Sequence, residues 1–126
     1  MNSDRPVNLP LPRLALAMPV TAMASILHRI TGVVLFVGMF FLCYLLDRAM
    51  ADAAGFEQAA ATLEAPLGKL GLWAILTSLA YHVVAGVKHL LLDFHVGDSL
   101  EGGRAGAWIS LAAASMAGVV LAVWLW

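Results

Sequence analysis

The 126-residue chain has few charged residues and almost no cysteine. Only 12% of its residues are charged and 62% are hydrophobic, whereas soluble domains average about 25% and about 45–50%. The formal net charge is −1, with no surplus of basic residues, so nothing indicates a nucleic-acid partner. This composition excludes an ordinary soluble domain and predicts an integral membrane protein.

Cys43 is the only cysteine, and it lies inside an apolar run. A single cysteine excludes an internal disulfide, covalent haem attachment through a CxxCH motif and a thiolate metal cluster. We therefore expect Cys43 to pack among apolar side chains.

Three long apolar stretches predict an all-α fold with three transmembrane helices. Crossing a hydrocarbon core of about 30 Å takes about 20 apolar residues, and the stretches 30–46, 70–87 and 105–126 meet this requirement. We place the complete spans at about 25–49, 66–94 and 105–126, after an N-terminal segment of residues 1–24. The polar connections between them do not resemble domains, so the chain is a single transmembrane domain.

The distribution of Lys and Arg predicts the orientation. Cytoplasmic ends of spans carry the excess of basic residues. One side of the predicted layout carries Arg5, Arg13, Arg29, Lys88 and Arg104, and the other carries only Arg48 and Lys69. We therefore expect a cytoplasmic N-terminus and a C-terminus on the opposite side.

The stretch AYHVVAGVKHLLLDFH, residues 80–95, places His82 inside the second span. A buried imidazole needs a polar partner or a ligand. His89 lies on nearly the same helix face, and the small residues Ser78 and Gly86 flank His82. Haem fits this pattern, with iron on the imidazole and propionates directed toward surface cations. An interhelical hydrogen bond or a proton relay would also explain an intramembrane histidine.

A six-coordinate b-type haem needs a second axial ligand. The chain has four histidines, and we expect His28, His89 and His95 to lie near the inner surface rather than at the depth of His82. If His82 binds haem, we therefore expect the second ligand to come from another chain.

The third span has small residues at every fourth position. Such a stripe lets another helix approach closely, and that helix could belong to this chain or to a partner. The stripe consists of Gly106, Ser110, Ala114, Gly118 and Ala122.

The stretch SILHRITG, residues 25–32, opens the first span. Ser25 and Arg29 share a helix face, and His28 lies next to them. A hydroxyl and a guanidinium can both donate hydrogen bonds to a quinone carbonyl. The alternative is an arginine that extends to the membrane surface and has no ligand.

Four stretches together resemble the cytochrome b556 subunit of succinate dehydrogenase, the larger membrane anchor of succinate:quinone oxidoreductase, in its proteobacterial form. The SxxHRx[ST] pattern combined with HxxxGx[RK]HxxxD is specific. Lys88 and His95 depart from the usual family residues, which are arginine and a small residue. The matching stretches are RPVNL (5–9), SILHRITGV (25–33), GFEQA (55–59) and AYHVVAGVKHLLLDF (80–94).

The resemblance implies a role for each of these residues. His82 would be one axial ligand of haem b, and the smaller hydrophobic anchor subunit would supply the other. Ser25 and Arg29 would line the ubiquinone site, while His28, Arg29 and His89 would lie near the haem propionates.

The resemblance also implies an assembly, respiratory complex II of the tricarboxylic acid cycle. An iron–sulfur subunit and a flavoprotein subunit would complete it at the bacterial inner membrane, with this chain's C-terminus in the periplasm. The isolated chain would catalyse nothing.

Two other readings of His82 remain. The chain could be a purely structural anchor without haem, in which His82 only packs. It could also conduct protons, but residues 70–78 offer no ionisable group to continue a proton path.

Overall fold

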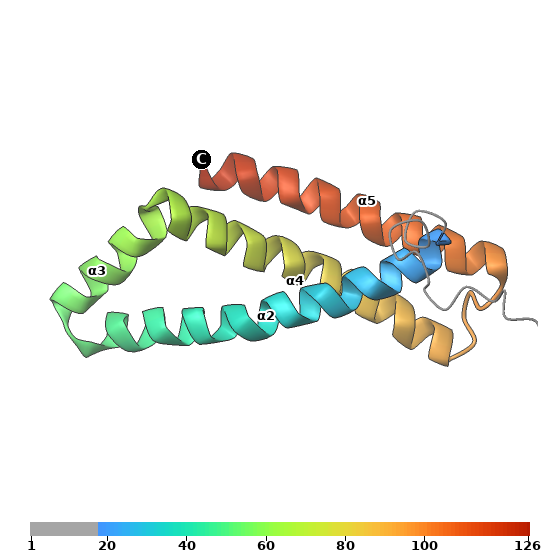
Figure 1. Cartoon of the computed structure of the whole chain (residues 1–126), viewed down its shortest axis with the longest axis horizontal. Helices are drawn as coiled ribbons and strands as arrows, with labels where there is room; N and C mark the ends of the chain where they lie inside the picture. The colour runs from blue at the N-terminus through green and yellow to red at the C-terminus, as the bar shows by residue number, and fades with distance from the viewer. Residues whose placement is uncertain (1–17) are drawn as a thin grey trace, which may run out of the picture.

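The computed structural model describes residues 18–126, which form four helices and no strand. Helices α2 (Val20–Ala51), α4 (Pro66–Asp93) and α5 (Leu100–Leu125) are long rods, and the short α3 (Ala53–Glu64) links α2 to α4 at one end (Figure 1). Each long helix is long and apolar enough to cross a membrane. The predicted all-α fold with three membrane-spanning helices is therefore confirmed.

Part of the predicted N-terminal segment, residues 1–24, lies outside the described residues, as do the RPVNL stretch, Arg5 and Arg13. Within the described part, α2 already begins at Val20, directly after Pro19. Proline suits this position because its missing N–H is not needed at the start of a helix.

The connection between the first two spans was expected to be a polar linker, but it forms the helix α3. Its sequence AAGFEQAAATLE is rich in alanine, the residue with the highest helix propensity. The carboxylate of Asp52 accepts a hydrogen bond from the Gly55 backbone N–H at 2.6 Å and caps the first turn. Gly55 and Gly68 are buried, and a Cβ at either would collide with backbone, at Arg48 and Thr62 respectively. These two glycines let α3 fold closely against α2 and α4.

The turn between α4 and α5 uses two residues with left-handed backbone conformations. His95 has φ 60° and Gly97 has φ 73°. The Ser99 hydroxyl then accepts a hydrogen bond from the Gly102 N–H at 3.0 Å and caps α5.

Helix α4 lies between α2 and α5 and is tied to both by side-chain donors. The Tyr81 hydroxyl, on a side chain that is 4% exposed, donates to the Ala24 carbonyl at 2.7 Å. On the other side, the Trp73 indole donates to the Gly118 carbonyl at 2.8 Å, and the Lys69 ammonium donates to the Leu125 carbonyl at 2.9 Å.

The small-residue stripe of α5 packs within this chain. A Cβ at Gly118 would lie 3.2 Å from the Thr77 side chain, and one at Gly106 would lie 3.2 Å from the Lys88 stem. Both neighbours belong to α4. At these positions, the helix that packs against the stripe therefore belongs to this chain and not to a partner.

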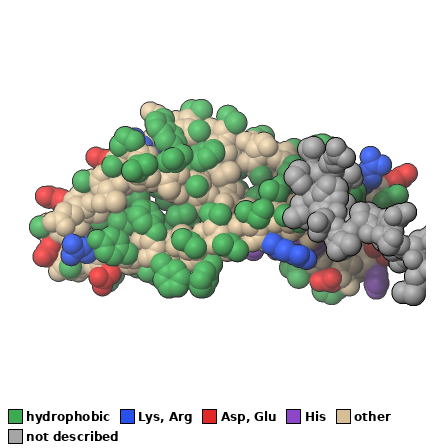
Figure 2. Space-filling model, viewed as in Figure 1, with side chains coloured by type: hydrophobic (Ala, Val, Ile, Leu, Met, Phe, Trp, Pro, Cys, Tyr) green, Lys and Arg blue, Asp and Glu red, His purple; other side chains and the backbone are tan. Residues whose placement is uncertain are grey.

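Most large apolar side chains lie on the outside of the bundle (Figure 2). Phe40 on α2 is 65% exposed and Val123 on α5 is 79% exposed, as expected for surfaces that face lipid or other membrane helices. Cys43 is also exposed. The expected packing of Cys43 among apolar side chains is therefore not found inside this chain.

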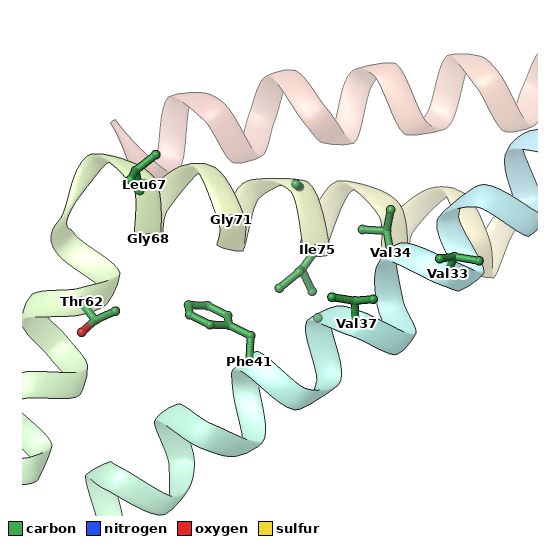
Figure 3. A pocket seen from close by; sticks show the side chains of 11 residues that line it. Val33, Val34, Val37, Phe41, Thr62, Leu67, Gly68, Gly71 and Ile75 are labelled. Carbon is green, nitrogen blue, oxygen red and sulfur yellow. The ribbon is translucent and has the colours of Figure 1, made fainter.

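A cavity of about 560 Å³ lies between α2, α3 and α4 (Figure 3). Val37 and Phe41 of α2 lie opposite Ile75 of α4, and Thr62 of α3 lies at one end. Its lining includes none of the predicted functional residues.

Candidate functional site

Three of the predicted residues meet where α2 crosses α4. The rings of His28 and His82 stack with centroids 4.0 Å apart and planes 13° apart. The His89 ring lies 5.2 Å from that of His28, tilted by 52°. His82 and His89 therefore share one face of α4, as their seven-residue spacing predicted, and His28 of α2 covers that face.

The stacking corrects one expectation. Counting residues along each helix placed His28 nearer the membrane surface than His82. The two rings stack on each other, so they lie at nearly the same depth. The count failed because it ignores how one helix is shifted against the other. Stacked, nearly parallel rings present their nitrogens side by side rather than toward each other. A single iron therefore cannot lie between these two imidazoles as they stand.

The hydrogen bonds of His82 fix its tautomer. Its Nδ1 lies 3.1 Å from the His28 carbonyl oxygen and 3.2 Å from the Thr31 hydroxyl. Because a carbonyl oxygen can only accept, we assign the proton to Nδ1, which donates to it. The neutral ring then carries its free lone pair on Nε2, and this arrangement is typical of histidines that bind a metal through one nitrogen.

Two glycines make room for the stacked rings. A Cβ at Gly32 would lie 3.2 Å from His82 Cε1, tighter than an ordinary contact, and a Cβ at Gly86 would lie 3.6 Å from His28 Nε2. Gly86, predicted to leave space for a flat ligand, thus borders the His28 ring.

The donor set fits a haem. With the proton on Nδ1, His82 offers an Nε2 lone pair, which suits iron. The Nε2 atom of His28 is buried and has no hydrogen-bond partner among residues 18–126. An orphaned buried nitrogen of this kind is uncommon, and a propionate or another polar group of a bound molecule would satisfy it.

Ser25 and Arg29 lie on the same stretch of α2 as His28. Ser25 is half-buried and Arg29 is exposed. Within the described part of the chain, neither side chain makes a hydrogen bond or an ion pair. No residue of 18–126 therefore occupies the hydrogen-bonding groups of these two side chains.

Two residues near the site were not recognised as participants. Thr31 contacts His82 through its hydroxyl, and the only sequence signal was its place in the SxxHRx[ST] pattern. Tyr81, next to His82, fixes α4 to α2 through its bond to Ala24. By contrast, His95 pairs with Asp98 at 3.4 Å in the exposed α4–α5 turn.

Comparison with known proteins identifies the family of this chain. Residues 1–122 match the family described as the succinate dehydrogenase/fumarate reductase transmembrane subunit. The chain is 38% identical over 127 residues to the succinate dehydrogenase cytochrome b556 subunit of Coxiella burnetii, with 100% of both chains covered. It is 32% identical over 84 residues to that of Paracoccus denitrificans, covering 67% of this chain and 65% of that protein. The chain therefore belongs to the family of succinate dehydrogenase/fumarate reductase transmembrane subunits.

Proposed function

We propose that this chain is a haem b-binding membrane anchor of succinate:ubiquinone oxidoreductase. The observation that carries the proposal is the state of His82, whose Nδ1–H is engaged by α2. Its Nε2 has no hydrogen-bond partner among residues 18–126 and keeps a lone pair for iron. The family relationship supports it, since the relatives from Coxiella burnetii and Paracoccus denitrificans are named cytochrome b556 subunits. A cytochrome of this type implies a b-type haem.

The residues of this chain would hold one side of the haem. His82 would be an axial ligand, and His28 and His89 would lie near the propionates, where the unsatisfied Nε2 of His28 is available as a partner. A histidine of a smaller hydrophobic anchor subunit would supply the second axial bond. When bound, haem b supplies a one-electron redox centre.

Ser25 and Arg29 would bind ubiquinone close to this centre. A serine hydroxyl and a guanidinium can each donate a hydrogen bond to a quinone oxygen, and the charge of the guanidinium strengthens its bond. Because both lie within one turn of His28 on α2, a quinone held here would lie beside the histidine cluster. The quinone tail would remain in the surrounding lipid.

The rest of the reaction would belong to other subunits. A flavoprotein subunit would oxidise succinate, and an iron–sulfur subunit would pass the electrons to quinone at the cytoplasmic end of this bundle. We place the N-terminus in the cytoplasm of a bacterium and the C-terminus in the periplasm. The chain itself would anchor these subunits, bind haem and position the quinone. It would not catalyse a reaction alone.

The visible spectrum of the complex purified through this chain tests the proposal. In the reduced-minus-oxidised spectrum we expect a b-type signal that His82→Ala abolishes or converts to a high-spin form. His95→Ala is the matched control, because His95 lies in the exposed turn. An unchanged spectrum in His82→Ala would remove this residue as a ligand and favour a structural anchor without haem.

A further inference from the structure

The Thr31 hydroxyl lies at the Nδ1 edge of the His82 ring, at 3.2 Å. Among residues 18–126 it is the only side-chain group hydrogen-bonded to that ring. The other partner of Nδ1 is the His28 carbonyl at 3.1 Å. One turn of α2 thus presents two oxygens to one imidazole nitrogen.

The direction of each hydrogen bond follows from the neighbours of Thr31. Its Oγ1 lies 2.9 Å from the Leu27 carbonyl and 2.9 Å from the His28 carbonyl. Carbonyl oxygens cannot donate, so the single hydroxyl proton of Thr31 is directed toward them. The hydroxyl therefore keeps a lone pair for the Nδ1–H of His82 and acts as an acceptor there.

We infer that Thr31 is a positioning residue that tunes haem through His82; the inference rests on the proposed ligand role of His82. An acceptor on the distal N–H of a ligating histidine holds the ring in place and makes the ligating nitrogen more basic. A more basic ligand favours ferric over ferrous iron, because it donates more electron density. The Thr31 hydroxyl therefore lowers the midpoint potential of the haem.

Thr31 is also the part of this contact that a substitution can remove. The His28 carbonyl belongs to the backbone of α2 and remains in every variant. Thr31→Val keeps nearly the same shape and replaces the hydroxyl with a methyl group, whereas Thr31→Ser keeps the hydroxyl and loses the methyl group. The pair therefore separates hydrogen bonding from packing.

A redox titration of haem in the purified complex tests the inference. In Thr31→Val we expect the haem to keep a low-spin spectrum. At a fixed ambient potential, the ferrous-to-ferric ratio should rise about threefold. This change corresponds to a midpoint potential raised by about 30 mV, at 59 mV per tenfold for one electron. Thr31→Ser should retain the wild-type potential. Thr62→Val is the control, since the Thr62 hydroxyl donates to the Gln58 carbonyl within α3, away from the histidines.

The outcomes distinguish this inference from the proposed function. If His82→Ala loses the haem signal but Thr31→Val keeps the wild-type potential, the role of Thr31 alone is overturned. If His82→Ala leaves the spectrum unchanged, the ligand assignment fails and the inference fails with it. Thr31→Val could instead lose haem altogether. In that case, the inference is supported if Thr31→Ser still binds haem with the wild-type midpoint potential. Loss of haem in both variants assigns the effect to shape and overturns it.

Discussion

The imidazole of His28 lies flat against that of His82, with 4.0 Å between ring centroids and 13° between planes. The contact joins α2 to α4 at the position where the His28 carbonyl also accepts from His82 Nδ1. One residue of α2 therefore constrains the His82 ring from its face and from its edge. Such double support restricts ring rotation, as precise placement of a ligand requires.

Gly32→Ala should disturb the imidazole of His82. The added Cβ would lie 3.2 Å from Cε1, so the ring must move by a few tenths of an ångström. We expect the low-spin haem signal of the complex to decrease and a high-spin signal to appear. Gly71→Ala is the control, because a Cβ at Gly71 meets nothing within 4 Å. Identical spectra for the two variants would show that the ring has more freedom than this packing indicates.

Tyr81→Phe should destabilise the bundle. The substitution removes the 2.7 Å bond to the Ala24 carbonyl and leaves that carbonyl without its partner from α4, a loss of about 1 kcal/mol. Unfolding of the purified complex in mixed detergent micelles measures this change. Tyr44→Phe, at a side chain that is 57% exposed, should change stability by less than about 0.5 kcal/mol. Equal losses in the two variants would contradict the structural role of the Tyr81 hydroxyl.

Arg29→Lys should impair quinone reduction selectively. Lysine keeps the charge but lacks the planar guanidinium, so we expect succinate–quinone activity to fall about tenfold, which corresponds to about 1.4 kcal/mol. Ser25→Ala should act in the same direction. Succinate oxidation with an artificial acceptor should not change, because that reaction would occur in the flavoprotein subunit.

Arg48→Lys is the control for this experiment, since Arg48 lies in the last turn of α2, at the opposite end from Arg29. A similar loss of quinone reduction in Arg48→Lys would argue against a site at Arg29. A parallel loss of the artificial-acceptor activity in Arg29→Lys would indicate failed assembly instead.

Site-directed labelling should reveal the orientation. In a Cys43→Ser background, a membrane-impermeant maleimide added to intact cells should label Glu57→Cys on α3. It should not label Glu101→Cys at the start of α5, which lies at the other end of the bundle (Figure 1). Both native side chains are exposed in this chain, so neither position is shielded by the bundle itself. The reverse pattern would place the N-terminus outside the cytoplasm.

The spans could be predicted because the thickness of the hydrocarbon core sets the length of an apolar run. The shared face of His82 and His89 could also be predicted, because helix periodicity fixes it. The residue of α2 that covers this face could not be predicted, since the offset between α2 and α4 depends on packing. For the same reason the stacking of His28 on His82 was missed.

The other omissions have local causes. Thr31 was passed over because a threonine hydroxyl in a helix usually bonds to its own backbone, which Thr31 also does. Helix α3 was missed because its residues, polar in part, suggested a loop between two spans, while its alanines and the Asp52 cap favour a helix.

The bonds that α4 makes to its neighbours have a consequence for evolution. In four of them the donor is a side chain of α4 and the acceptor is a backbone carbonyl of α2 or α5. Every amino acid supplies a carbonyl, so an accepting position such as Leu125 can change its side chain and keep the bond. The donors Lys69, Trp73, Tyr81 and His82 have no such freedom. We therefore expect substitutions to accumulate faster at the acceptor position Leu125 than at these donors.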